Sequence, residues 1–441
     1  MATALCRIAA GLLVALLATI YASGGARADE WYEVSKAGLR AADEGRFDDA
    51  EALFREALRL SDEYTEGDPR QATSVNNLAY ILHAQGRYLA AEPHYRESLA
   101  MRETALGPDH PDVAQSCNNL AELYRVLGRY PEAEPLHQRA LEIREAAFGA
   151  KHPEVAQTLN NLGVLYANQG LFEKAEPLYQ RALEIRTASY GKDHLTTAET
   201  RQNLATLYYA QSRYEEAEPL YQQALEIEQK ALGAEHPSLA TTLSNLAELH
   251  RVQGRLDEAV ELHRRALAIR EKALGPNHPE TAQSLNNLAV AHFAKGEYQT
   301  AEELYERSIA IKEAALGADH PELALTLNNL AELYRTLRRF DEAEPLYVRA
   351  LRIDEASLGP THPSLALGLN NLALLHYDRG AYVEAEPLLR RALSIEEKAL
   401  GPEHLELVTT IRNLAEVLRE LRHYEEADQL ESRANALRAQ L

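Results

Sequence analysis

The chain has 441 residues and a formal net charge of −21 at pH 7, with 67 acidic against 46 basic side chains. This acidic excess argues against binding to nucleic acid or to anionic membranes, and it favours a basic partner. Length alone would allow roughly two or three globular domains. A repeat that fills most of the chain predicts instead one solenoid domain, in which each repeat contacts only its neighbours.

The first residues have the pattern of a secretory signal peptide. Arg7 precedes an apolar run over residues 8–20, and Ala26-Arg27-Ala28 is a small-residue cleavage pattern. The run is shorter than the roughly 20 residues that span a membrane, which leaves an uncleaved anchor as the alternative. We expect a signal peptide over residues 1–28, cleaved before Asp29. Loss of two arginines would take the charge from −21 to −23, and the mature protein would be exported, periplasmic or secreted by a bacterium, and not inserted in a membrane.

An asparagine recurs every 42 residues along most of the chain. A fixed period of this size marks a stack of similar supersecondary units. Residues 29–69 are expected to form a degenerate first repeat that lacks the asparagine. Residues 70–441 are expected to form nine 42-residue repeats of one solenoid, the last repeat acting as a cap. The asparagines are Asn77, Asn119, Asn161, Asn203, Asn245, Asn287, Asn329, Asn371 and Asn413.

The stretch from His152 to His194 illustrates one repeat. Leu159, Leu162 and Tyr166 have helical spacing, and Gly170 ends this first helix. A second helix follows with Ala175, Tyr179 and Ala182 on one face, and it ends at Gly191. Short turns make neighbouring helices antiparallel, so the expected fold class is all-α, with about ten helix pairs.

The spacing of Leu162, Gly163, Tyr166, Gly170, Phe172, Ala175, Tyr179 and Ala182 resembles the tetratricopeptide repeat. The longer 42-residue period and the strings NNLA, EAEPLY, RALEIRE and LGPDHP resemble the kinesin light chain type, from about Trp31 to the C-terminus. The resemblance implies a right-handed superhelix of paired helices whose first helices line a concave face. It also implies peptide binding on that face, with the recurring asparagine on the peptide backbone. It does not imply motor transport.

No pattern of residues indicates catalysis. The chain has no HExxH, GxSxG, phosphate-binding glycine loop or CxxC pair, and we expect no enzyme activity and no cofactor. Cys117 falls in a slot that is leucine in other repeats, so it is interpreted as a packed apolar residue. Eight histidines recur between repeats, but equivalent points on stacked helices lie about 10 Å apart, which favours helix capping over a metal site. They are His110, His152, His194, His236, His278, His320, His362 and His404.

The candidate binding residues lie on the first helix of each repeat. An amide can donate and accept, so the asparagines either hold the backbone of an extended peptide or link one helix to the next. Six residues after the asparagine, the slot holds Arg125, Arg251, Arg335 and Arg419 in some repeats and Tyr209, Phe293 and Tyr377 in others. Each arginine follows a glutamate by three residues, which predicts a pair along the helix or, alternatively, a contact with partner carboxylates.

Together these features predict an exported, non-enzymatic scaffold that binds an extended peptide segment of a partner protein in its concave groove. One alternative is a structural component of the cell envelope that self-associates. Another is a non-catalytic regulator of a separate enzyme. At the C-terminal end Glu431 replaces the tyrosine of Tyr347, in a slot expected to face a following repeat that is absent.

Overall fold

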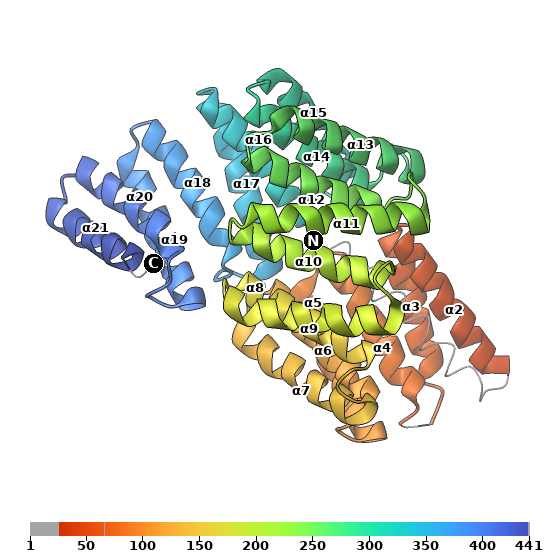
Figure 1. Ribbon diagram of the computed structural model, residues 1–441. Helices are drawn as coiled ribbons and strands as arrows, with labels where there is room; N and C mark the ends of the chain where they lie inside the picture. Colours follow the sequence, from red (N-terminus) through yellow and green to blue (C-terminus); the bar gives the residue numbers. More distant parts are fainter. Residues whose placement is uncertain (1–25, 66, 440–441) are drawn as a thin grey trace. The chain divides into compact units, whose positions relative to one another are not determined.

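The computed structural model describes residues 26–65 and 67–439, and all regular structure among them is helical (Figure 1). Helices α2 to α21 form ten consecutive antiparallel pairs, which we number repeat 1 (α2–α3) to repeat 10 (α20–α21). The all-α prediction of about ten helix pairs is therefore confirmed. The first helices are α2 (Ala26–Asp43), α4 (Pro69–Ala84), α6 (Pro111–Val126), α8 (Pro153–Asn168), α10 (Leu195–Ala210), α12 (Leu239–Val252), α14 (Pro279–Ala294), α16 (Glu322–Thr336), α18 (Ser364–Asp378) and α20 (Leu407–Glu420). The second helices are α3 (Phe47–Ser61), α5 (Tyr88–Leu106), α7 (Tyr130–Phe148), α9 (Phe172–Tyr190), α11 (Tyr214–Leu232), α13 (Leu256–Leu274), α15 (Tyr298–Leu316), α17 (Phe340–Leu358), α19 (Tyr382–Leu400) and α21 (Tyr424–Arg438).

The expected signal peptide falls almost entirely outside the described residues. Residues 1–25 are not described, and residues 26–28 are the first residues of α2. Among the helices that are described, none combines the length and the apolar character needed to cross a membrane.

The chain divides into two compact parts, residues 26–284 and residues 285–439, with the division inside α14. Each part is described by itself below.

Local chemistry explains the start of α8 and the ends of both helices in repeat 4. In repeat 4 the His152 Nδ1 accepts a hydrogen bond from the backbone N–H of Glu154 at 3.2 Å, which caps α8. Gly170 and Gly191 follow α8 and α9 with φ of +70° and +93°, a region that favours glycine. Arg338 and Ser212 occupy the slot of Gly170 in other repeats, and both take the same left-handed conformation at φ +59°.

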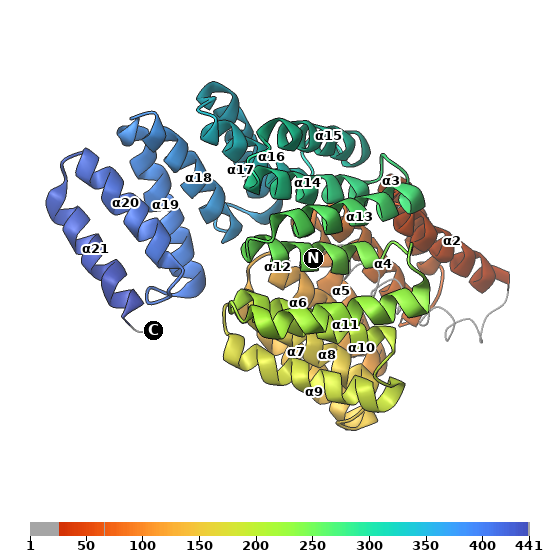
Figure 2. The same ribbon diagram turned by 45° about the horizontal axis from the view of Figure 1, so that its top comes forward.

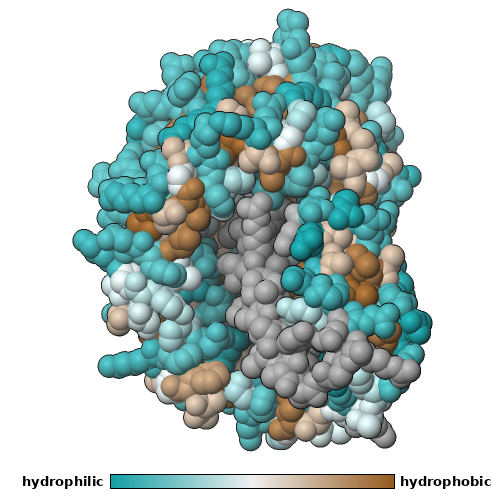
Figure 3. Space-filling view, turned by 90° about the vertical axis from the view of Figure 1, so that its right-hand side faces the viewer, coloured by the Kyte–Doolittle hydropathy of each residue, from teal (hydrophilic) through white to brown (hydrophobic). Residues whose placement is uncertain are grey.

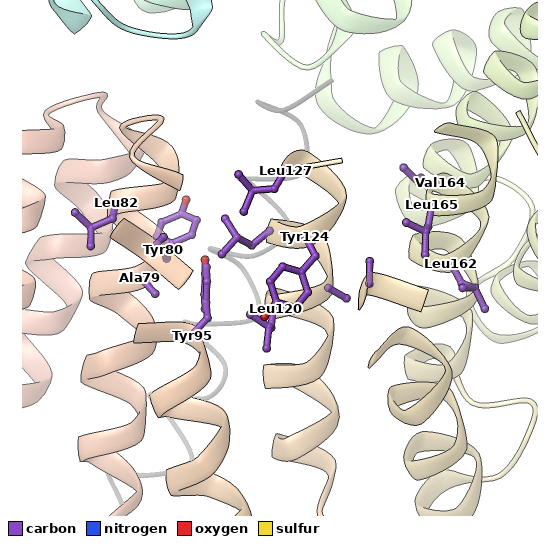
Figure 4. Close-up of a cluster of buried hydrophobic side chains, with 14 of the residues drawn as sticks. Ala79, Tyr80, Leu82, Tyr95, Leu120, Tyr124, Leu127, Leu162, Val164 and Leu165 are labelled. Carbon is purple, nitrogen blue, oxygen red and sulfur yellow. The ribbon is translucent and has the colours of Figure 1, made fainter. Parts of the chain in front are cut away.

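The core lies between the two helices of each repeat and between neighbouring repeats. Figure 4 shows part of it in residues 26–284, where Tyr80, Tyr95, Leu120, Tyr124 and Leu162 come from four helices and are buried together. The slot that holds alanine in most repeats lets the paired helices approach closely. Gly163 occupies it in repeat 4, and a Cβ there would lie 2.8 Å from the Tyr179 ring. On the face seen in Figure 3, hydrophilic residues predominate and apolar residues form small separate groups.

The first helices form the inner layer of each part. In residues 26–284, α6 contacts α8, α8 contacts α10, and α10 contacts α12, besides the contacts that each helix makes with the second helices on either side. In residues 285–439 the same holds for α16 with α18 and for α18 with α20. Direct contact between first helices places them on the more tightly curved side of the stack, as Figure 2 lets the reader follow. We call the exposed surface of these first helices the inner face.

Candidate functional site

The recurring asparagines lie on the inner face, and all but one of them are partly exposed; Asn77 is buried. Four donate to the first helix of the preceding repeat. Asn119 Nδ2 donates to Asn76 Oδ1 at 2.9 Å, and Asn203, Asn329 and Asn413 donate in the same way to Asn160, Asn286 and Asn370 at 3.0, 3.0 and 3.2 Å. These amides therefore link successive repeats, which is one of the two roles considered from sequence. The acceptor, which stands just before the recurring asparagine of the preceding repeat, was missed, although the NN doublet was its signal.

The remaining asparagines are not equivalent. Asn161 Oδ1 accepts from Gln157 at 3.1 Å, and Asn287 Oδ1 accepts from its neighbour Asn286 at 3.3 Å. Among the described residues, the side chains of Asn245 and Asn371 make no hydrogen bond, and each is partly exposed. The asparagine ladder thus contains amides already used for packing and amides whose donor and acceptor face solvent.

The arginines of the inner face pair with glutamates of the same helix, as the spacing predicts. The Nε to Oε2 distances are 2.7 Å for Arg125 with Glu122, 2.8 Å for Arg251 with Glu248 and 2.8 Å for Arg335 with Glu332. The hydrogen bond from Arg251 to Glu248 is the main cause that raises the pKa of Arg251. Arg335 also bonds Asp378 in the next repeat. Such pairs contribute only a few tenths of a kcal/mol each when exposed, but they place formal charges of both signs along the inner face.

Repeat 10 departs from this pattern at its last slot. Arg419 bonds Glu431 and Asp428 of α21, and not Glu416 three residues before it. In repeat 8 the same slot holds Tyr347, which is fully buried and whose Oη donates to Glu332 Oε2 of its own repeat at 2.9 Å, whereas the side chain of Glu431 is partly exposed. The carboxylate of Glu431 therefore replaces an intra-repeat contact, because an arginine of the same repeat now supplies the donor.

The aromatic residues of the inner face each contact an aromatic ring at the turn to the second helix. Ring centroids lie 5.9 Å apart for Tyr209 with Tyr214, 5.7 Å for Phe293 with Tyr298 and 5.3 Å for Tyr377 with Tyr382. Tyr209 Oη also donates to Glu248 Oε1 at 3.1 Å, one repeat along. All three candidate rings are partly exposed, so each presents an apolar edge on the inner face while it stays fixed by its partner ring.

The histidines between repeats each accept a backbone hydrogen bond near the start of a first helix, and His110, His152 and His194 are the N-cap residues of α6, α8 and α10. In repeat 3 the backbone N–H of Asp112 donates to His110 Nδ1 at 3.2 Å, and the other seven histidines repeat this bond two residues along. No group of potential metal ligands gathers anywhere in the part of the chain that the structure describes. Cys117 is fully buried, and burial raises the pKa of its thiol to about 11, so it is an unreactive packed residue as expected.

A further period was missed from sequence: one slot of the second helix holds a buried or half-buried charge. In repeat 3, Arg144 Nη1 donates to Thr158 Oγ1 of the next repeat at 2.8 Å, and Nη2 donates to Gln115 Oε1 of its own repeat at 2.9 Å. These partners lie 14 residues after and 29 residues before the arginine. The signal was the same 42-residue period, although the residue type varies. The slot holds Arg102, Arg144, Arg186, Glu228, Arg270, Lys312, Asp354 and Glu396.

The comparison with protein families matches this geometry. The tetratricopeptide repeat profile matches residues 35–104, 70–146, 113–176, 154–230, 203–272, 238–314, 288–356, 322–397 and 364–440. These matches cover most of the chain, so the protein belongs to the tetratricopeptide repeat family, and the family prediction is confirmed. Proteins of this family are in general non-catalytic scaffolds for protein–protein interaction. No curated protein matches the chain.

Solved structures give the following similarities. A putative kinesin light chain from Podosopora anserina, with nearly identical tetratricopeptide-like repeats, is 30% identical over 46% of this chain and 97% of its own, with a TM-score of 0.40. BtubC (BKLC) from P. vanneervenii is 27% identical over 53% of this chain and 93% of its own, with a TM-score of 0.43. A Rap protein complexed with the competence and sporulation factor is 16% identical over 93% of this chain and 98% of its own, with a TM-score of 0.51, which supports the fold alone.

Proposed function

We propose that the protein is an exported scaffold that binds an extended segment of a partner protein along its inner face. The proposal rests on the observation that the recurring asparagines differ in their hydrogen bonding. Some amides link the repeats, whereas Asn245 and Asn371 keep a donor and an acceptor exposed at the same slot. An amide so placed can accept from a backbone N–H and donate to a backbone carbonyl, which holds an extended chain without reading its sequence.

Membership of the tetratricopeptide family and the mixed chemistry of the inner face support this function. Exposed aromatic edges alternate with Glu–Arg pairs along successive repeats. Apolar side chains of a partner segment would contact the rings, and charged ones would exchange with the ion pairs. A flat, uniformly polar surface would offer neither kind of contact. The Rap protein of similar fold was solved in complex with the competence and sporulation factor, which is consistent with ligand binding by such a fold.

The test uses residues 29–441 and a displayed library of random peptides of about nine residues. An extended chain advances about 3.3 Å per residue and stacked helices about 10 Å, so such peptides span roughly three repeats. Asn245→Ala and Asn371→Ala, one in each part of the chain and tested as single variants, should each lower the affinity of the peptides that bind that part about tenfold or more and leave the melting temperature unchanged. The matched control changes two exposed residues of second helices, Arg265→Ala and Ser394→Ala, and should bind as the parent does. Failure to select any peptide, with self-association of the protein, would favour an assembly role instead.

Export is the second element of the proposal, and it rests on the pattern of residues 1–28. Expression of the full chain in a bacterial host followed by fractionation should recover it outside the cytoplasm. Mass spectrometry of that material should give Asp29 as the first residue. A full-length chain retained in the cytoplasm would contradict export without touching the peptide-binding proposal.

A further inference from the structure

The buried charged slot follows one rule in every repeat that holds it except repeat 8: its tip is bonded by the hydroxyl of the threonine or serine 14 residues along, on the next first helix. Arg270 repeats both contacts of Arg144, with Ser284 Oγ at 2.9 Å and Thr241 Oγ1 at 3.1 Å. Where the slot is acidic, the hydroxyl donates instead of accepting. Glu228 accepts from Thr242 Oγ1 at 2.7 Å and from Gln202 Nε2 at 2.8 Å. Each of these charges therefore has at least one hydrogen-bonding partner inside the stack.

Asp354 in repeat 8 breaks the rule. The position 14 residues after it, a threonine or serine in the other repeats, is Gly368, and the position 29 residues before it is Leu325. Among the described residues, the Asp354 carboxyl makes no hydrogen bond and no ion pair, although it is partly buried in α17. Burial alone raises its pKa to about 7. An ionised carboxyl that is partly buried without a hydrogen-bond donor lowers the stability of the folded protein.

The same glycine removes a second hydrogen bond. In repeat 9, Asn370 Nδ2 donates to the hydroxyl of Thr410 at 2.7 Å, 40 residues along. Asn328 in repeat 8 meets Gly368 at that spacing, so its Nδ2 keeps only the bond to the Ala324 carbonyl at 3.0 Å, whose equivalent Asn370 also makes, and its Oδ1 is buried without a partner in the described structure. Three polar groups of one junction therefore lack their usual bonds: the Asp354 carboxyl, Asn328 Oδ1 and the Asn371 amide.

Exposed apolar side chains lie over the same junction. The slot four residues before the recurring asparagine is polar in repeats 2 to 7 and in repeat 10, with residues such as Gln115, Gln157 and Thr241. In repeats 8 and 9 it holds Leu325 and Leu367, which are 51% and 62% exposed. The pattern thus changes from polar to apolar on the two first helices whose junction contains the unsatisfied groups, α16 and α18.

We propose that this surface is the anchor of the partner segment: a lysine or arginine of the segment binds Asp354, and an adjacent aliphatic side chain packs on Leu325 and Leu367. The inference rests on the proposed function and adds the chemistry of the residue pair that is recognised. A basic side chain supplies the donor that Gly368 removed, and its methylene stem suits an apolar surround. The net charge of −21 attracts such a partner as well. The amide of Asn371 lies on the same helix as Leu367 and is available to the segment's backbone.

The experiment selects the displayed peptides on residues 29–441 and measures their dissociation constants on three variants. Asp354→Asn keeps the shape and removes the charge. The triple variant Leu325→Gln, Asp354→Arg and Gly368→Thr gives the junction of repeats 8 and 9 the residue types that Gln115, Arg144 and Thr158 supply at the junction of repeats 3 and 4. A Cβ at Gly368 would lie 2.8 Å from Leu351 Cδ2, so that side chain must move in the triple variant. Asp354→Asn keeps the test valid if the triple variant does not fold. Glu396→Gln is the matched control one repeat along, where Thr410 already donates to the carboxyl at 3.0 Å.

The selected peptides should be enriched in a basic residue next to an aliphatic one. Asp354→Asn should weaken their binding about tenfold to a hundredfold, since a charge-assisted hydrogen bond is lost. The triple variant should abolish it, and Glu396→Gln should change it less than about twofold. Peptides that lose affinity on Asn245→Ala but bind Asp354→Asn and the parent equally would overturn the anchor and leave the proposed function standing. Equal losses of peptide affinity on Asp354→Asn and Glu396→Gln would also overturn it, because they would show that the effect comes from net charge and not from contact with Asp354. If no peptide binds the parent at all, both proposals fail.

Discussion

The junction of repeats 3 and 4 and the junction of repeats 8 and 9 have the same helix geometry and opposite polar chemistry. At the first, Arg144 reaches Gln115 and Thr158, and Asn118 Nδ2 donates to the same threonine at 3.2 Å. At the second, Asp354 and Gly368 stand in those places, and the equivalent bonds are missing. A solenoid can lose a buried polar network at one junction because the stability of each junction is nearly independent of the others. The missing bonds make the second junction less stable, but they leave polar groups, such as the Asp354 carboxyl and the Asn371 amide, available to a ligand.

The largest expected difference in the free energy of unfolding is between removing Arg144 and removing Asp354, which occupy the same charged slot at the two junctions. Arg144→Ala should lower the free energy of unfolding by about 2–3 kcal/mol, because Thr158, Gln115 and a backbone carbonyl lose a buried charged donor. Asp354→Ala should not lower it, since no bond is broken and a buried carboxyl is removed. Urea unfolding followed by circular dichroism measures both values. Similar losses for the two variants would erase the difference between the junctions.

The pH dependence of stability sharpens the same comparison. The folded-state pKa of Asp354, about 7, lies above the ordinary value of 3.8. The folded protein therefore keeps a proton that the unfolded chain has lost, and this cost grows as pH rises from about 4 to 7 and stays above 7. Asp354→Asn should be more stable than the parent at pH 8 by about 1–3 kcal/mol and equal to it near pH 4. Glu228→Gln should give a smaller gain, because burial raises the pKa of Glu228 as well but the hydrogen bonds from Thr242 and Gln202 to its carboxylate offset part of that effect. A flat difference across pH for Asp354→Asn would contradict the prediction.

The asparagines offer a smaller contrast. Asn119→Ala removes a bond to Asn76 and one from Gln115, and it should cost about 1–2 kcal/mol. Asn371→Ala removes no bond within the described structure and should stay within about 0.5 kcal/mol. Thermal melts of the two single variants measure this difference in stability. Equal destabilisation would mean that Asn371 also packs the repeats and is no candidate for a ligand.

The smallest expected effect lies at the turn inside repeats 8 and 9. Arg338→Gly should stabilise the protein by about 0.5–1 kcal/mol, since φ of +59° strains any residue with a Cβ. Gly380→Arg, at φ +77° in the next repeat, should destabilise it by a similar amount. Differential scanning calorimetry should resolve the opposite shifts in melting temperature. Shifts of the same sign would show that side-chain contacts outweigh the backbone term.

Most of the fold could be predicted from the sequence because periodicity fixes it. The helix ends at Gly170 and Gly191, the histidine caps and the close contact at Gly163 each follow from a local rule that a single repeat displays. The partners of side chains could not be predicted in the same way. Asn119 and Asn371 are identical in the sequence pattern, and only the packed structure distinguishes the amide that is bonded from the one that is not.

The candidate site was predicted in part for a related reason. The Glu–Arg pairs at Arg125, Arg251 and Arg335 follow from helical spacing and were predicted. Arg419 instead pairs with carboxylates of the facing helix α21, which helical spacing does not predict. Asp354 escaped notice because its meaning depends on two residues far along the chain, Leu325 and Gly368, which become its neighbours only after the repeats stack. The role of all these residues in ligand binding remains a prediction.

Because the bonds between repeats join equivalent slots, they depend on the period and not on the total length. The bond from Asn119 to Asn76 spans 43 residues, and the same span recurs from Asn413 to Asn370. A gene that gains or loses one whole 42-residue segment between the ends would therefore encode a chain whose repeats keep the same spacing at every junction. An insertion of any other length would misalign the hydrogen-bonding slots at the junction where it falls, because each repeat contacts only its neighbours. Recombination between similar segments is therefore expected to lengthen or shorten the inner face in one step, and point mutations at a single junction to change what it binds.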